Sequence, residues 1–120
     1  MAFSRDPDSQ IYTPFIDDFN SYSEKNNLDI IIHLNLLTIL NTTYSFTSYG
    51  SMIENLLRKK SQKYDIFFYD NLYTLKYAPH LLDLNNEIPN ELLNKYDKDI
   101  IANTCSYDDR LVGLVINYIY

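Results

Sequence analysis

One short apolar stretch, residues 64–71, constrains the fold of this chain more than any other segment. Its sequence is YDIFFYDN, an apolar run that follows a basic segment and is closed by polar residues. The run lacks the apolar–polar alternation of a half-buried strand, so it is typical of a strand buried on both faces within a parallel sheet. Ligands of open α/β sheets bind beyond the carboxyl ends of such strands, which makes Tyr69, Asp70 and Asn71 the first candidates for ligand contact.

Two further strands are predicted before this stretch, with a helix between them. Residues 2–4 fit a short first strand, and residues 28–40 fit a second strand because their run of isoleucines suits a pleated surface. The helix between them places Pro14 in its first turn and ends near Asn26 and Asn27. Its apolar positions, which recur at helical spacing, are Ile11, Phe15, Ile16, Phe19 and Tyr22.

A second helix is predicted directly before the central stretch. A polar and aromatic loop at residues 41–50 leads into it, and Ser48 is its expected N-cap. Basic residues at positions 58–60 close it, where cations complement the helix dipole. Its single buried stripe has the spacing of one helix face and consists of Tyr49, Met52, Ile53, Leu56 and Leu57.

Helical patterns continue after the central stretch. Residues 71–78 are predicted to be helical, with Tyr73 and Tyr77 on one face, and residues 81–84 to be extended or turn-like. Residues 100–102 fit either a short helix or the entry to a strand. A further helix has Pro89 in its first turn and continues through Glu91, Leu92, Leu93 and Tyr96.

A hairpin is predicted near the end of the chain. Residues 104–107 and 110–115 flank Asp108 and Asp109, which are turn-forming residues. The full order is therefore strand, helix, strand, helix, strand, helices and hairpin. This order predicts an α/β fold, a three-layer arrangement with a mainly parallel sheet, within a single domain over residues 1–120.

Composition and spacing argue against several functions. The net charge of −6 and the pI near 4.6 oppose a nucleic-acid surface, which needs a basic footprint. The two glycines cannot form a Gly-rich phosphate loop, and the two histidines lack metal-ligand spacing. Cys105 is the single cysteine, and the sequence places no base beside it. We therefore expect no catalysis, no cofactor and no metal site, and no apolar run is long enough to span a membrane.

Polar and aromatic residues follow each of the three predicted strands. Because the carboxyl ends of parallel strands meet at one edge of a sheet, we expect these groups to lie together. Tyr rings offer flat apolar faces with a polar tip, and Asp, Asn and Arg orient hydroxyl groups, so the mixture suits a sugar or another small polar ligand. Ordinary surface loops in a chain with 12 tyrosines are the alternative. The candidate ligand-binding residues are Ser4, Arg5, Asp6, Tyr69, Asp70, Asn71 and Tyr73.

The order and spacing of five segments resemble a known family. They are residues 19–34 (FNSYSEKNNLDIIIHL), 49–60 (YGSMIENLLRKK), 64–71 (YDIFFYDN), 77–84 (YAPHLLDL) and 105–114 (CSYDDRLVGL). Together they are similar to the N-terminal part of lobe one in extracellular solute-binding proteins of the family that includes maltodextrin binders. That family has the type 2 periplasmic-binding, or Venus-flytrap, fold.

The resemblance implies a non-catalytic protein that closes two lobes around a solute, often a carbohydrate. It also implies an extracellular or cell-surface location, and a membrane receptor or transporter as partner. In such proteins lobe-one contacts come from the loop after the first strand, here Ser4 to Asp6, and from the residues after the third strand, here Tyr69 to Tyr73. Tyr69 matches a position where an aromatic ring stacks on sugar.

The chain departs from the family pattern in three ways. Val115 stands where the family has a proline that enters the hinge, no signal peptide precedes the first strand, and the second lobe is missing. Without that lobe the third strand would lose a neighbour, and open sheet edges invite pairing with another chain. We therefore expect a fragment of a longer binding protein. The alternative is an interaction module, or a non-functional truncated domain, that binds no small ligand and self-associates through open sheet edges.

Overall fold

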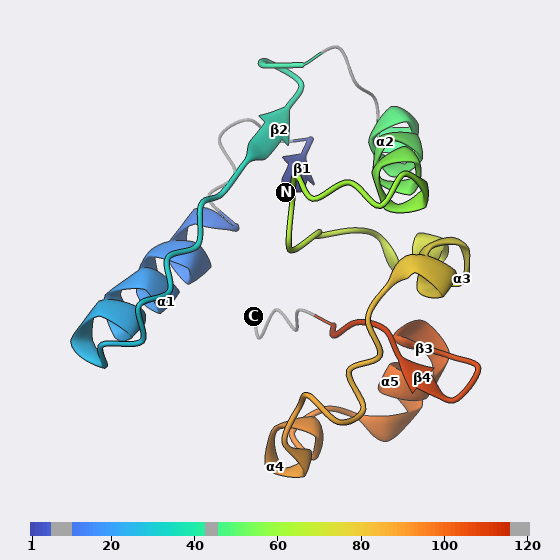
Figure 1. The fold of residues 1–120 in the computed structure, drawn as a ribbon. Helices are drawn as coiled ribbons and strands as arrows, with labels where there is room; N and C mark the ends of the chain where they lie inside the picture. The colour runs from blue at the N-terminus through green and yellow to red at the C-terminus, as the bar shows by residue number, and fades with distance from the viewer. Residues whose placement is uncertain (6–10, 43–45, 116–120) are drawn as a thin grey trace. The chain divides into compact units, whose positions relative to one another are not determined.

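The computed structural model describes residues 1–5, 11–42 and 46–115, without the side chains of residues 46 and 47. Figure 1 shows its helices and strands along the chain. The chain divides into two compact units, which we describe separately. The first unit consists of Met1–Met52 and Gln62–Tyr69, and the second consists of Ile53–Ser61 and Asp70–Tyr120.

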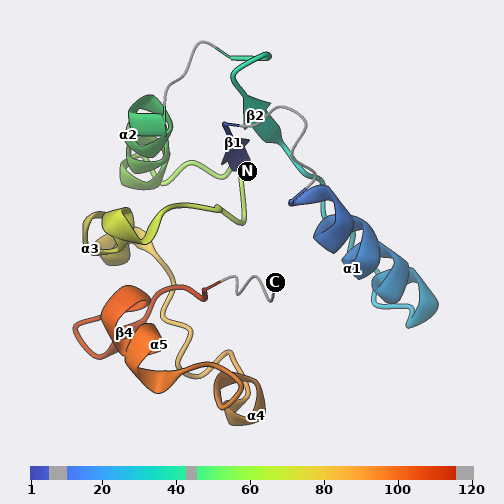
Figure 2. The same cartoon turned by 180° about the vertical axis from the view of Figure 1, so that it is seen from behind.

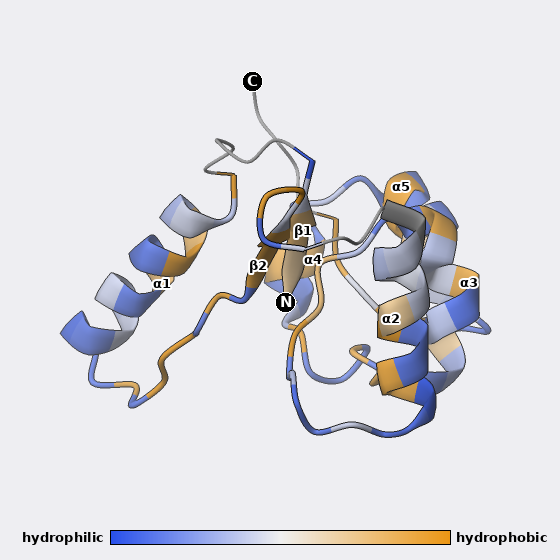
Figure 3. Cartoon of the chain, turned by 90° about the horizontal axis from the view of Figure 1, so that it is seen from above, coloured by the Kyte–Doolittle hydropathy of each residue, from blue (hydrophilic) through white to orange (hydrophobic). Residues whose placement is uncertain are grey.

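A parallel pair of strands organises the first unit. β1 (Ala2–Ser4) confirms the predicted first strand, and it pairs with β2 (Leu36–Thr38) in a register that aligns Phe3 with Leu37. Every residue of β1 is buried. Figure 3 shows the pair largely in the colours of hydrophobic residues. Removal of these apolar side chains from water is the main driving force that holds so short a pair together.

The predicted central strand at residues 64–71 is wrong, because the segment runs extended with only one bridge to a neighbour in the described part of the chain. The Met1 amino group donates to the Ile66 carbonyl at 2.7 Å, and the Phe68 amide donates to the Met1 carbonyl at 2.9 Å. These are the bonds of a single parallel bridge. The Tyr49 hydroxyl donates to the Phe68 carbonyl at 2.8 Å. The next hydrogen bond of a parallel ladder would need this carbonyl as its acceptor, so the pairing does not continue. The segment is not buried on both faces, since Ile66 is 52% exposed.

The first predicted helix is confirmed as α1 (Thr13–Lys25). Pro14 lies in its first turn, where a missing N–H breaks no helical hydrogen bond. The helix ends at Asn26 and Asn27, and Asn27 has a left-handed φ of 52°, as expected at such a cap. The expected apolar stripe is only partly buried, because Ile16 is covered whereas Phe15 is exposed.

The predicted second strand, residues 28–40, is wrong over most of its length, because its isoleucine run lies against α1. Asn20 of α1 donates to the Ile32 carbonyl at 3.0 Å through Nδ2 and accepts from the Ile32 amide at 2.8 Å through Oδ1. The Ser23 hydroxyl donates to the Ile30 carbonyl at 2.6 Å. Helix side chains therefore satisfy the backbone groups that a neighbouring strand would bond, and this overrides the β-propensity of isoleucine.

The second predicted helix is confirmed as α2 (Phe46–Arg58), with Tyr49 and Ile53 buried on its stripe and the basic residues at its end. Its first half belongs to the first unit and its second half to the second. The helix begins earlier than predicted, so Ser48 is not its N-cap and the loop before it is shorter. Gly50, which suggested a loop, lies buried inside the helix. A helix interior accepts a glycine at a cost of about 0.5–1 kcal/mol.

The helical segment predicted after the central stretch is confirmed in the second unit. Tyr73 and Tyr77 share a face as predicted, and their rings stack with centroids 5.4 Å apart and planes at 8°. The segment consists of a 3-10 turn, η1 (Asn71–Tyr73), then α3 (Thr74–Tyr77) and a second 3-10 turn, η2 (Ala78–His80).

Two short helices follow. α4 (Asn90–Leu93) confirms a helix at this place, but Pro89 is its N-cap instead of lying in its first turn, and the helix ends before Tyr96. The next helix, α5 (Lys98–Thr104), decides the two alternatives for residues 100–102 in favour of a helix. Asp97 starts α5 because its side chain accepts from two of the first amides of that helix, so α4 cannot continue through this position.

The predicted hairpin of the second unit is confirmed at its turn, but its arms are shorter than predicted, because Thr104 ends α5 and residues 112–115 form no strand (Figure 2). β3 (Ser106–Tyr107) and β4 (Arg110–Leu111) are antiparallel. Asp108 and Asp109 have φ values of 50° and 59°, the left-handed pair that a type I′ hairpin turn requires. The Arg110 guanidinium donates to two backbone carbonyls at and just after η2, which holds the hairpin against that turn.

These elements establish part of the predicted fold class. A small parallel sheet lies among helices and short strands, which is compatible with a fragment of an α/β protein. Each of the two sheets in the described residues has two strands. The larger three-layer sheet therefore stays a prediction, and residues 116–120, expected to continue the last strand, lie outside the described residues.

Removal of the Tyr49 hydroxyl should destabilise the first unit. Tyr49 is buried, and Tyr49→Phe leaves the Phe68 carbonyl without this donor, at a cost of about 1–3 kcal/mol in the free energy of unfolding. Urea denaturation measures the change. As the control, Tyr22→Phe alters a side chain that is 58% exposed and should cost less than about 0.5 kcal/mol. Equal effects of the two substitutions would contradict this role of Tyr49.

The ion pair between Glu54 and Lys76 should make stability depend on pH. The hydrogen bond from Lys76, at 2.7 Å, is the main cause that holds the pKa of Glu54 below its usual value of 4.5, and Arg58 adds to it. The stabilisation is present above the unfolded pKa and disappears as the pH falls through the lower folded pKa. Glu54→Gln should therefore lower the melting temperature at neutral pH but not in strong acid.

A matched substitution controls for the loss of one negative charge. Glu87 is exposed and has no ion-pair partner among the described residues, so Glu87→Gln should change the melting temperature little at any pH. High salt should shrink the effect of Glu54→Gln, because exposed pairs are screened. A Glu54→Gln effect of the same size in strong acid would show that it does not come from the ion pair.

Candidate functional site

The predicted ligand-binding residues are divided between the two units, and Asp6 lies outside the described residues. Ser4 is buried as the last residue of β1, and Arg5, directly after it, is exposed. Because the register aligns Ser4 with Thr38, the ends of β1 and β2 share one edge, as expected for parallel strands. The first unit contains Ser4, Arg5 and Tyr69, and the second contains Asp70, Asn71 and Tyr73.

Two of the predicted ligand-binding residues have structural contacts in the second unit. Asp70 is the N-cap of η1, and its side chain accepts from the Leu72 amide at 2.9 Å. Tyr73 stacks on Tyr77. These contacts give Asp70 and Tyr73 a structural role that needs no ligand. Their role in ligand binding stays a prediction.

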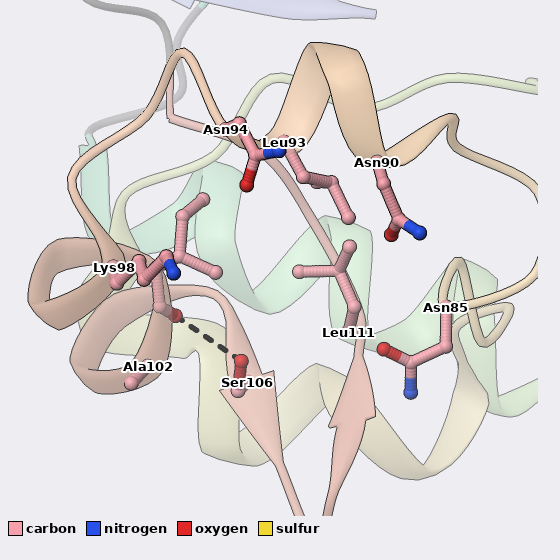
Figure 4. A pocket seen from close by; sticks show the side chains of 9 residues that line it. Asn85, Asn90, Leu93, Asn94, Lys98, Ala102, Ser106 and Leu111 are labelled. Carbon is pink, nitrogen blue, oxygen red and sulfur yellow. Dashed lines mark hydrogen bonds between the residues drawn. The ribbon is translucent and has the colours of Figure 1, made fainter.

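A pocket of about 300 Å³ lies in the second unit, among α4, α5 and the hairpin (Figure 4). We call it the amide pocket, because three asparagine side chains line it. The short helices position these side chains: Asn90 begins α4, Asn94 is its C-cap, and Lys98 begins α5. The lining residues are Asn85, Asn90, Leu93, Asn94, Lys98, Ile101, Ala102, Ser106 and Leu111.

The floor of the amide pocket is apolar. Leu111 of β4 is 4% exposed, and the Leu93 side chain points toward it from α4 (Figure 4). The Ser106 hydroxyl donates to the Ile101 carbonyl at 3.2 Å and joins α5 to the hairpin. The Leu111 carbonyl accepts from the Leu84 amide at 2.7 Å. These two bonds, one from the Ser106 hydroxyl and one between backbone groups, fix the floor and leave its apolar side chains as a contact surface.

The rim of the amide pocket is polar and exposed. Asn85 is held by a bond from its Nδ2 to the Asp109 carbonyl at 2.8 Å, which leaves its Oδ1 on the side of Leu111 (Figure 4). In the described part of the chain, the side chains of Asn90, Asn94 and Lys98 have no hydrogen-bond or ion-pair partner. Their donors and acceptors are therefore available for a ligand.

The first unit contains a second hollow, of about 730 Å³, along α1 and the segment that follows it. Asn20 and Ser23 line it, but both already bond to the isoleucine run, so the hollow follows from how that run lies against the helix. It carries the carboxylates of Asp17, Glu24 and Asp29. Asp17 and Glu24 are exposed on α1, and Asp29 is exposed in the segment after it, so all three are ordinary solvated carboxylates.

The residues that the structure describes contain no group of three or more His, Cys, Asp or Glu side chains that could hold a metal ion. Cys105 is a buried thiol at the end of α5, and its Sγ lies 3.4 Å from the Thr104 hydroxyl. Within the described ranges, no helix has both the length and the apolar composition that a membrane crossing needs.

Sequence reasoning missed the amide pocket. Asn85, Asn90 and Asn94 are not among the candidate residues predicted from the sequence. The sequence signal for this pocket is the spacing of Asn90, Asn94 and Lys98, which follow one another at intervals of four residues. Residues four apart lie on one side of a helix. Comparisons with protein-family models, with curated proteins and with solved structures find no match. The resemblance to solute-binding proteins therefore stays a prediction.

Proposed function

We propose that this chain binds a small polar solute in the amide pocket without converting it. One observation carries the proposal: the side chains of Asn90, Asn94 and Lys98 lack partners among the described residues and surround an apolar floor. Pockets that bind small molecules combine such a floor with a few polar groups that orient the ligand. A hydrolytic or redox role has no comparable support.

A carbohydrate or related hydroxylated solute suits this lining best. Side-chain amides can both donate to and accept from hydroxyl groups, and leucine side chains can contact the C–H face of a sugar ring. The volume of about 300 Å³ is at the lower end of the range for ligand pockets, so a monosaccharide fits better than a long oligosaccharide. Lys98 is the only charged residue among the described residues that line the pocket, which favours neutral or anionic ligands over cations.

The wider setting of this activity follows from the resemblance in segment order. We propose that residues 1–120 are part of lobe one of an extracellular solute-binding or receptor ligand-sensing protein, with a membrane receptor or transporter as its partner. The small parallel sheet and the confirmed order of helices support this. The predicted residues Ser4, Arg5 and Tyr69 of the first unit, and Asp70, Asn71 and Tyr73 of the second, stay candidates for ligand contact, each within its own unit.

Substitutions in the amide pocket should weaken sugar binding. Titration calorimetry with glucose, maltose and glucuronate measures it directly. Asn94→Leu removes one hydrogen-bonding group, so affinity should fall about 2- to 12-fold, equivalent to about 0.5–1.5 kcal/mol. Lys98→Met should weaken the binding of glucuronate more than that of glucose, because it removes the only lining charge.

The control for these variants is a nearby asparagine outside the pocket. Asn86 is exposed and does not line the amide pocket, so Asn86→Leu should leave affinity unchanged. The proposal fails if none of the three sugars binds, or if Asn94→Leu and Asn86→Leu have equal effects. Binding that Asn94→Leu does not alter, but that Tyr69→Ala abolishes, would move the site to the residues predicted from the sequence.

Three exposed leucines in the second unit favour a second candidate function, that of an interaction module. Leu72, Leu75 and Leu82 are 81%, 69% and 67% exposed, although leucines are usually buried. Leu72 and Leu75 are three residues apart in the η1–α3 segment, so they lie on one side of it. Exposed apolar groups in such proximity mark contact surfaces for other proteins.

Self-association measurements test this second function. If the leucines form a contact between copies, light scattering of the wild type should show a mass that rises with concentration, and Leu72→Ser with Leu75→Ser should reduce that rise. Leu92→Ser, at a less exposed leucine of α4, is the control and should have little effect. If the wild-type mass stays constant over the concentration range, the leucines do not form a contact between copies of this chain.

A further inference from the structure

The outer edge of β2 carries backbone groups that β1 does not use. Parallel pairing with β1 engages the Asn35 carbonyl, which accepts from the Ala2 amide at 3.0 Å. Backbone groups alternate between the two edges along a strand, so the Leu36 carbonyl and the Thr38 amide face away from β1. An edge with such groups is a template for pairing with a further strand.

One side chain bonds both of these outward groups. The Thr38 amide donates to Asn41 Oδ1 at 2.7 Å, and Asn41 Nδ2 donates to the Leu36 carbonyl at 2.9 Å. In a parallel ladder, a single residue of the next strand, opposite Leu37, would make the same two bonds with its own carbonyl and amide. The Asn41 side-chain amide therefore takes the place of one residue of a neighbouring strand.

The turn after β2 fixes Asn41 in this position. The amides of Asn41 and Thr42 both donate to the Thr38 carbonyl, at 3.3 and 3.1 Å, so the chain reverses directly beyond the strand. Ile39 and Leu40 lie in this turn and are 56% and 78% exposed. Apolar side chains next to an edge of backbone groups would favour association if that edge were open.

We infer that Asn41 prevents the outer edge of β2 from pairing with the same edge of a second copy of this chain. The second copy is the specific partner because it presents the same short edge together with its own Ile39 and Leu40. A two-fold axis pairs two such edges antiparallel, so the contact is self-complementary and uses the same outward backbone groups. The inference concerns the first unit and does not depend on the amide pocket.

The substitution Asn41→Ala tests this directly. It removes both bonds, so the average mass in sedimentation should rise with concentration toward that of a dimer, above the wild type at each concentration. The Thr38 amide should also exchange its hydrogen faster at low concentration, because Asn41 no longer accepts from it. Asn41→Asp keeps an acceptor for the Thr38 amide but not the donor to the Leu36 carbonyl, so its association should be intermediate.

Two further variants separate edge pairing from simple loss of stability. Asn103→Ala removes one exposed amide bond, to the Asp99 carbonyl within α5, and should leave the average mass as in the wild type. Adding Ile39→Lys to Asn41→Ala places a charge beside the open edge and should restore the wild-type mass. The inference is overturned if Asn41→Ala does not associate more than the wild type, or if Ile39→Lys fails to reverse the association.

Discussion

The burial of β1 is the constraint on which the first unit depends. Its residues and Met1 are at most 9% exposed. β2 pairs along β1, and the extended segment at Ile66 and Phe68 bonds to Met1, the residue directly before β1. Tyr49 covers it as well, since its ring stacks on Phe3 with centroids 5.4 Å apart. A strand so short cannot hold through its ladder alone, so these contacts stabilise it together.

Polar side chains satisfy many of the backbone groups that longer strands would bond. Asn20 bonds both backbone groups of Ile32, and Asn41 bonds the Leu36 carbonyl and the Thr38 amide at the outer edge of β2. In the second unit, Arg110 donates to carbonyls around η2 and Asn85 donates to the turn of the hairpin. Buried or partly buried backbone groups must find partners, and in this chain asparagine amides provide many of them. Asparagine residues that carry no structural signal in the sequence therefore stabilise the fold by bonding backbone groups.

The helices and the hairpin could be predicted because their signals are local. The Asp108–Asp109 pair needs only its own φ values to form the hairpin turn, and the α2 stripe needs only its spacing. The long strands were mispredicted because β structure depends on which groups lie alongside. Isoleucine residues suit a strand, but here α1 bonds the backbone of the run, and the Tyr49 hydroxyl ends the pairing of the central segment. The amide pocket was missed because its lining comes together only when α4, α5 and the hairpin pack.

The sequence by itself determined the acidic character of the chain, its lack of a Gly-rich phosphate loop or cysteine pair, and the approximate positions of its first two helices and its hairpin turn. Those properties follow from composition and from interactions between residues a few positions apart. Only the tertiary structure decided what happens at residues 64–71. The apolar run that predicts a central strand is instead an extended segment, with one bridge to Met1 and its Phe68 carbonyl bonded to Tyr49. A strand is defined by its hydrogen-bonded neighbour, and that neighbour is distant in the sequence.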